Sequence, residues 1–140
     1  MKYLCVGLFL LSFLAPAASF AEPLRDDHPL IGEWKLTLPG GACEEIYRIH
    51  KDGTMRVSSA EEESESVFRI SDRFSANGYF RWDDKVVKSN GKKDCTGEAT
   101  PVGDEATNYI FLDPSWKMFL LCSEEKLTHC IGPFIKIKGL

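Results

Sequence analysis

The feature that most constrains the fold is the regular alternation of short apolar runs with turn signals. From residue 30 onward, runs rich in β-branched and aromatic side chains recur about every 8–12 residues, a spacing typical of all-β sandwiches and barrels. The pairs Asp52-Gly53 and Asn77-Gly78 tolerate the positive φ that tight hairpin turns require. The pattern predicts strands at residues 32–38, 43–50, 54–59, 66–74, 79–88, 108–112, 116–122 and 130–138.

Residues 93–99 make a poor strand by composition and would be the ninth, and no segment has a convincing helical pattern. Residues 60–65, Ala-Glu-Glu-Glu-Ser-Glu, form the one charge run, which we expect to be a solvated loop or a short helical turn. Short links favour an up-and-down order, and closure would remove exposed strand edges. We therefore expect an all-β domain over residues 30–140, a single up-and-down antiparallel barrel of about eight strands.

The first 21 residues have the pattern of a signal peptide. Lys2 precedes an apolar stretch over residues 4–14, and Ser19-Phe20-Ala21 places small residues where a signal peptidase cleaves. The apolar stretch is shorter than the roughly 20 residues that a membrane span needs. We expect an exported protein, periplasmic or secreted, with no membrane insertion of the mature chain. Residues 22–29 would be a polar lead-in, either a mobile terminus or a strap over the barrel mouth.

Four of the five cysteines remain after cleavage: Cys43, Cys95, Cys122 and Cys130. An even number in an exported chain predicts two disulfides, with three possible connectivities. A zinc site is the alternative, but no two of these cysteines have Cys-x-x-Cys spacing, so we expect no metal. Cys122 and Cys130 flank a polar turn and could face each other across a hairpin, which would leave Cys43 to pair with Cys95.

Charge excludes one class of partner. Without Lys2 the chain has 16 basic and 21 acidic side chains, a net charge of −5. Phosphate groups would be repelled, so neither nucleic acid nor an anionic membrane surface is an expected partner.

The sequence offers little support for catalysis. The three histidines, His28, His50 and His129, have no metal-binding spacing, and no serine lies in a Gly-x-Ser-x-Gly motif. Phosphate-binding and dinucleotide motifs are also absent, so we expect no cofactor, no catalytic residue and no enzymatic activity.

Two pairs of carboxylates are candidates for acid–base catalysis. Asp83 and Asp84 would point to opposite faces of a strand and could not act on one atom. Glu45 and Asp72 each share a predicted face with apolar residues. If that face is interior, either would need a partner such as Arg81 or Arg69, and otherwise the assumed register is wrong.

The first strand begins with Gly32-Glu33-Trp34, and this Gly-x-Trp motif, with the strand pattern, resembles the lipocalin-like (calycin) β-barrel families. The resemblance implies that Trp34 closes the barrel floor and that a basic side chain of the last strand, Lys136 or Lys138, lies across it. Gly32, Trp34 and Lys136 are thus expected to form the floor.

Two binding functions follow from this architecture. The first is a carrier of a small hydrophobic molecule, because a closed eight-stranded barrel is just wide enough for one small ligand. Its candidate walls are Phe68, Phe74, Phe80, Trp82 and Phe119. The second is a periplasmic module that binds an exported protein, such as an inhibitor or immunity protein for a hydrolase. The acidic residues 61–65 would then steer the module to a basic cleft.

Overall fold

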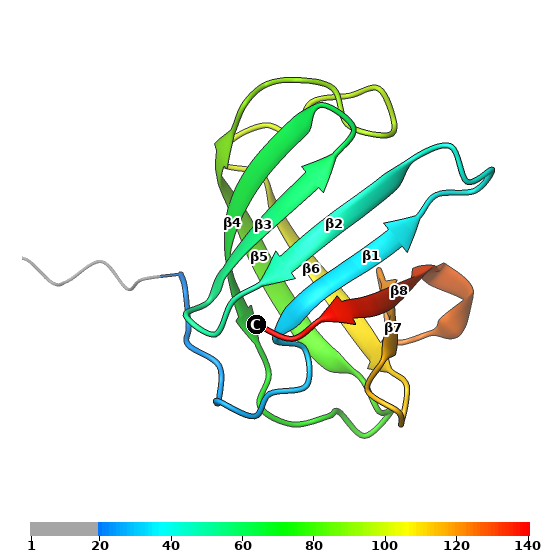
Figure 1. The fold of residues 1–140 in the computed structure, drawn as a ribbon. Coiled ribbons are helices and arrows are strands. Elements are labelled where there is room, and N and C mark those ends of the chain that lie inside the picture. Colours follow the sequence, from blue (N-terminus) through cyan, green and yellow to red (C-terminus); the bar gives the residue numbers. More distant parts are fainter. Residues whose placement is uncertain (1–19) are drawn as a thin grey trace, which may run out of the picture.

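The computed structural model describes residues 20–140, which form one closed antiparallel barrel with its eight strands in sequence order (Figure 1). The predicted signal peptide therefore lies almost wholly outside the described residues. The strands are β1 (Gly32–Thr37), β2 (Glu44–Ile49), β3 (Thr54–Ser59), β4 (Glu62–Ile70), β5 (Phe80–Ser89), β6 (Glu105–Leu112), β7 (Met118–Cys122) and β8 (Cys130–Lys138).

Each strand pairs with the next, and β1 pairs with β8 to close the barrel. This confirms the predicted all-β class and up-and-down order. The glycines of the Asp-Gly and Asn-Gly turns, Gly53 and Gly78, have φ of 82° and 85°, as tight turns require. The weak segment at residues 93–99 is not a strand but belongs to the loop 90–104 between β5 and β6.

The acidic run was predicted wrongly. Only Ala60 and Glu61 form a turn, whereas residues 62–65 are neither a loop nor a helical turn, because β4 begins at Glu62 and its alternate side chains point into the barrel. Glu62, Ser64, Ser66, Phe68 and Ile70 are all buried, while their neighbours face outward. Among the described residues the only helical segment is a single 3₁₀ turn at Leu127–His129.

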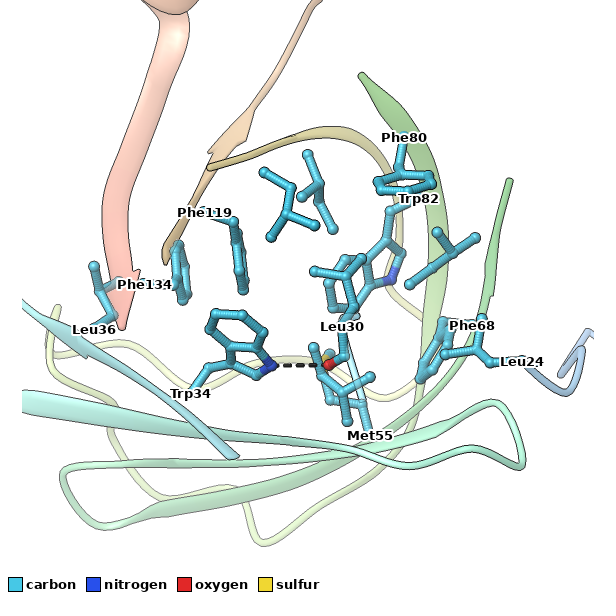
Figure 2. Packing of buried hydrophobic residues seen from close by; sticks show 14 residues of the cluster. Leu24, Leu30, Trp34, Leu36, Met55, Phe68, Phe80, Trp82, Phe119 and Phe134 are labelled. Carbon is cyan, nitrogen blue, oxygen red and sulfur yellow. Dashed lines mark hydrogen bonds between the residues drawn. The ribbon is translucent and has the colours of Figure 1, made fainter. Parts of the chain in front are cut away.

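The inward side chains fall into two tiers along the barrel axis. Where β1, β3 and β5 begin, the interior is filled by a continuous apolar cluster (Figure 2), which includes Trp34, Phe68, Phe80, Trp82, Phe119 and Phe134. Toward the other end the inward residues become polar, with Glu45, Ser59, Glu62 and Ser64 all buried. We call the apolar end the floor and the polar end the mouth.

Trp34 is fully buried at the centre of the floor (Figure 2). Its indole Nε1–H donates a hydrogen bond of 2.8 Å to the carbonyl oxygen of Leu30, and its ring meets that of Phe119 edge-on at 4.8 Å. Trp34 therefore fills the end of the barrel while its one polar atom, the indole nitrogen, is hydrogen-bonded.

Gly32 and Lys136 complete the floor as the sequence predicted. The ammonium of Lys136 lies 5.0 Å from the centre of the Trp34 ring, in cation–π range, and donates to the carbonyl of Pro29. Gly32 has a φ of 143°, and a β-carbon there would lie 2.6 Å from the carbonyl oxygen of Lys138. Only glycine allows β1 and β8 to approach this closely.

Residues 22–30 form a strap across the floor. Leu24 and Leu30 are buried in the apolar cluster, and the backbone N–H of Leu24 donates to the carbonyl of Lys51. His28 is buried beside the Phe80 ring at 5.2 Å, and burial lowers the pKa of its imidazole. The segment is a strap, as one of the two expectations had it, but the predicted position was wrong: it covers the floor that Trp34 fills and not the mouth, because Leu24 and Leu30 are buried in the apolar cluster.

The two disulfides are Cys122–Cys130 and Cys43–Cys95, the connectivity expected from the hairpin argument. The first joins β7 to β8. The second ties the β1–β2 turn to the loop 90–104, across a sequence separation of 52. Because it closes a long loop, it restricts the unfolded chain more than the short bridge does.

We predict that Trp34→Ala lowers the free energy of unfolding by about 3–5 kcal/mol, since it leaves a large cavity and removes the hydrogen bond to Leu30. Trp116 is the matched control, because its side chain is 55 % exposed. Trp116→Ala should change stability by less than about 0.5 kcal/mol. Urea unfolding followed by circular dichroism measures both, and equal midpoints for the two variants would contradict the floor assignment.

Candidate functional site

A cavity of about 210 Å³ lies inside the barrel, between the apolar floor and the mouth. Its lining combines four aromatic side chains with carboxylates and hydroxyls. The lining residues include Tyr47, Trp82, Phe119, Phe134, Glu45, Glu62, Asp84, Asp94, Ser59, Ser64, Ser66, Thr100 and Asn108.

The predicted wall residues divide into three groups. Trp82 and Phe119 line the cavity, whereas Phe68 and Phe80 are buried but contribute only to the floor cluster. Phe74 was predicted wrongly: its side chain is 52 % exposed, in the loop after β4, where its ring packs on Phe80. The prediction assumed that the strand continues to residue 74, whereas β4 ends at Ile70 and the chain turns there.

Three polar side chains form a row across β2, β3 and β4. Ser59 lies opposite Glu45 on one side and opposite Glu62 on the other. The Ser59 hydroxyl donates to Glu45 at 2.6 Å and accepts a hydrogen bond from the backbone N–H of Cys95. Because neighbouring strands are about 4.8 Å apart, the two glutamates are held on separate strands roughly 10 Å apart.

Glu45 points into the barrel, which was one of the two expectations, but its hydrogen-bond partners are neutral side chains and not an arginine. Its second oxygen accepts a hydrogen bond of 2.7 Å from the hydroxyl of Tyr47. Burial, together with the adjacent Glu45 carboxylate, raises the pKa of Tyr47, so this hydroxyl stays protonated and remains a donor. No arginine reaches Glu45, since Arg81 pairs with Asp83 on the outer face. Asp72 is not interior, because it lies exposed in the loop after β4.

Glu62 is the most deeply buried of these carboxylates, with 3 % of its surface exposed. Its hydrogen bonds come from the loop 90–104 and, at 3.5 Å, from the hydroxyl of Ser89 at the end of β5. Thr100 donates its backbone N–H to one carboxylate oxygen at 2.6 Å and its hydroxyl to the other at 2.9 Å. Since Cys95 in the same loop is bonded to Cys43, the loop is fixed to the barrel on both sides of the cavity.

Asp83 and Asp84 point to opposite faces of β5, as predicted. Asp84 lines the cavity, and burial, reinforced by the charges of Asp104 and Asp83, raises its pKa to about 6. Burial also acts to raise the pKa of Asp83, but hydrogen bonds from Thr107 and Arg81 outweigh it, so the pKa of Asp83 lies below its ordinary value.

Sequence reasoning missed Glu62 and Asp84 as cavity residues. The signal for Glu62 was present, because alternation at Glu62, Ser64, Ser66 and Phe68 is continuous. It was overlooked because consecutive glutamates are typical of solvated segments. The inward face of Asp84 follows from the positions of Phe80 and Trp82 on the same strand.

Two further features of the lining concern its polarity. Among residues 20–140, no lysine, arginine or histidine lines the cavity. Trp82 is 4 % exposed, and within the same residues its buried indole Nε1–H has no hydrogen-bond partner. The cavity therefore has an excess of negative charge, and one of its wall residues carries a buried donor without a partner.

A second hollow of about 550 Å³ adjoins the cavity at the mouth. Its lining comes from residues 36–39 of β1 and its turn and from residues 130–132 of β8, with Glu45 common to both hollows. It lies where β1 and β8 separate, because their pairing ends at Leu36 and Phe134.

No protein-family model, curated protein or solved structure matches this chain. Across residues 20–140, no helix is long and apolar enough to cross a membrane. The site is therefore interpreted from its own geometry.

We predict that Asp84→Asn stabilises the protein at pH 7. The raised pKa means that Asp84 holds its proton up to about pH 6 in the folded state, whereas the ordinary pKa of an aspartate is 3.8. The stability that Asp84 contributes is thus fully present below the unfolded pKa and is lost as pH rises through the folded pKa. After allowance for partial exposure, the asparagine variant should gain about 1–2 kcal/mol at pH 7.

Urea unfolding between pH 4 and pH 7 measures this effect, and the gain should shrink steadily toward pH 4. Asp83→Asn is the control, because its depressed pKa gives the opposite sign and a loss of stability at pH 7. A variant at Asp84 that is no more stable than the parent at pH 7 would show that this carboxylate is well solvated.

Proposed function

We propose that this protein is an exported, non-enzymatic, lipocalin-like binding protein that holds one small ligand with an apolar body inside its barrel. The observation that carries the proposal is the cavity beside Trp82 and Phe119. Its volume of about 210 Å³ exceeds the roughly 150 Å³ of a cavity that accepts benzene and is below the roughly 300 Å³ of common ligand pockets. A ligand of one ring with a short chain fits this size.

The architecture around the cavity supports binding. The floor is closed by Trp34 and the strap, so a ligand would enter from the mouth. The aromatic rings of Phe119 and Phe134 are stacked at 4.5 Å and are already in place. A pre-formed site loses little conformational entropy on binding.

Export supports the same function. Two disulfides indicate an oxidising compartment. Together with the predicted signal peptide they favour a periplasmic or secreted protein that meets its ligand outside the cytoplasm.

The alternative, a module that binds an exported protein, has less support. It relied on an exposed acidic loop, but residues 62–65 belong to β4. Of the outward glutamates there, Glu65 pairs with Arg56 and Lys88, which reduces the charge available for steering.

Binding can be tested with 2-phenylethanol as a probe, by recording amide and indole NMR spectra of the mature chain. We expect the largest shifts at the Trp82 indole N–H and at residues that line the cavity. Ala106, exposed at the mouth opposite Asp84, offers a blocking variant, and Ala106→Trp should abolish the shifts without unfolding the barrel. Absent shifts, or shifts that persist in Ala106→Trp, would contradict binding in the cavity.

A further inference from the structure

The charge inside the barrel is not balanced by the protein. Glu45, Glu62 and Asp84 line one cavity, and each ion pair found within residues 20–140 involves other carboxylates. Hydrogen bonds from Tyr47, Ser59 and Thr100 satisfy part of the acceptor capacity of the two glutamates but bring no positive charge. Buried charges in proteins are normally paired.

From this imbalance we propose that the ligand is a small organic cation, an amine with an aromatic or short aliphatic body, whose ammonium group binds among Glu45, Glu62 and Asp84. The inference rests on the proposed small-molecule binding and gives that ligand its chemical class.

The aromatic part of the lining fits the same class. The cavity that the carboxylates line is also bordered by four aromatic side chains: Tyr47, Trp82, Phe119 and Phe134. The faces of such rings attract a cation, most strongly where water is excluded, and their area accommodates the ligand's apolar body. An amine with an aromatic ring would use both properties.

The Trp82 indole is a second, independent indication of a ligand. Its side chain points into the barrel from β5, and its N–H has no partner among the described residues. A buried donor without a partner costs about 1–3 kcal/mol, which an acceptor on a bound molecule would offset.

A bare metal ion fits less well. Within residues 20–140, no group of three or more histidine, cysteine, aspartate or glutamate side chains is arranged to hold one. Glu45 and Glu62 are separated by the whole of β3, so an extended cation that reaches several carboxylates suits the spacing better.

The test uses isothermal titration calorimetry of the mature chain at pH 7.5 with three probes of similar size: 2-phenylethylamine, 2-phenylethanol and phenylacetate. We expect the amine to bind at least about tenfold more tightly than the alcohol, because a charge-assisted contact is worth more than a neutral one. Phenylacetate should not bind measurably.

Equal affinities for amine and alcohol, or a preference for phenylacetate, would overturn the assignment of a cation while leaving small-molecule binding in place. Binding of none of the three would overturn the proposed function as well.

Variants locate the ammonium group. Glu62→Gln keeps the shape and an acceptor for Thr100 but removes the charge, so amine affinity should fall about tenfold while alcohol affinity is unchanged. Glu63→Gln is the matched control, because Glu63 faces outward on the same strand and accepts from Ser58. It should leave both affinities unchanged.

Circular dichroism and thermal melting check that the variants fold. Should Glu62→Gln unfold, Asp84→Asn, which is expected to be more stable than the parent, provides the same readout. A loss of amine affinity in Glu63→Gln equal to that in the cavity variants would show that general surface charge is responsible, and would overturn the proposal.

Discussion

The structure depends on how Trp34 closes one end of the barrel. Its indole is fully buried, hydrogen-bonded to Leu30 and covered by the Lys136 ammonium. These contacts tie β1, β8 and the N-terminal strap to one side chain. With the floor filled by Trp34 and its aromatic neighbours, the remaining interior volume lies toward the mouth. The position of the cavity is therefore a consequence of the floor.

The interior toward the mouth is built differently from the floor. Hydrophobic burial stabilises the floor, whereas the mouth tier contains two buried carboxylates, Glu45 on β2 and Glu62 on β4, which are held by neutral donors. The half-buried Asp84 on β5 lies beside them. Burial raises the pKa of Asp84, so its charged form lowers the stability of the fold at neutral pH. Proteins commonly retain destabilising groups where function needs them. This contrast is the physical basis for assigning binding to the mouth.

Most of the fold could be predicted from the sequence, because turn residues and period-two patterns are local signals. The floor residues were expected from the resemblance that the Gly32-x-Trp34 motif carries, and the disulfide pairing from the polar turn between Cys122 and Cys130. The cavity was not. Whether Phe80 fills the floor while Trp82 lines a hollow depends on the stagger of strands around the barrel, which no local pattern reports. Glu62 was missed because its charge suggested solvent, although its alternation with Ser64 and Phe68 indicated the interior.

We propose that the barrel combines a solid floor with a negatively charged cavity that accepts an organic cation. A crystal structure of the mature protein with 2-phenylethylamine would test this proposal. We expect the nitrogen atom within hydrogen-bond distance of Glu45, Glu62 or Asp84, with the ring against Trp82 and Phe119 and the contacts of Trp34 unchanged. An amine bound only on the outer surface, or a mouth tier in which side chains fill the cavity, would contradict it.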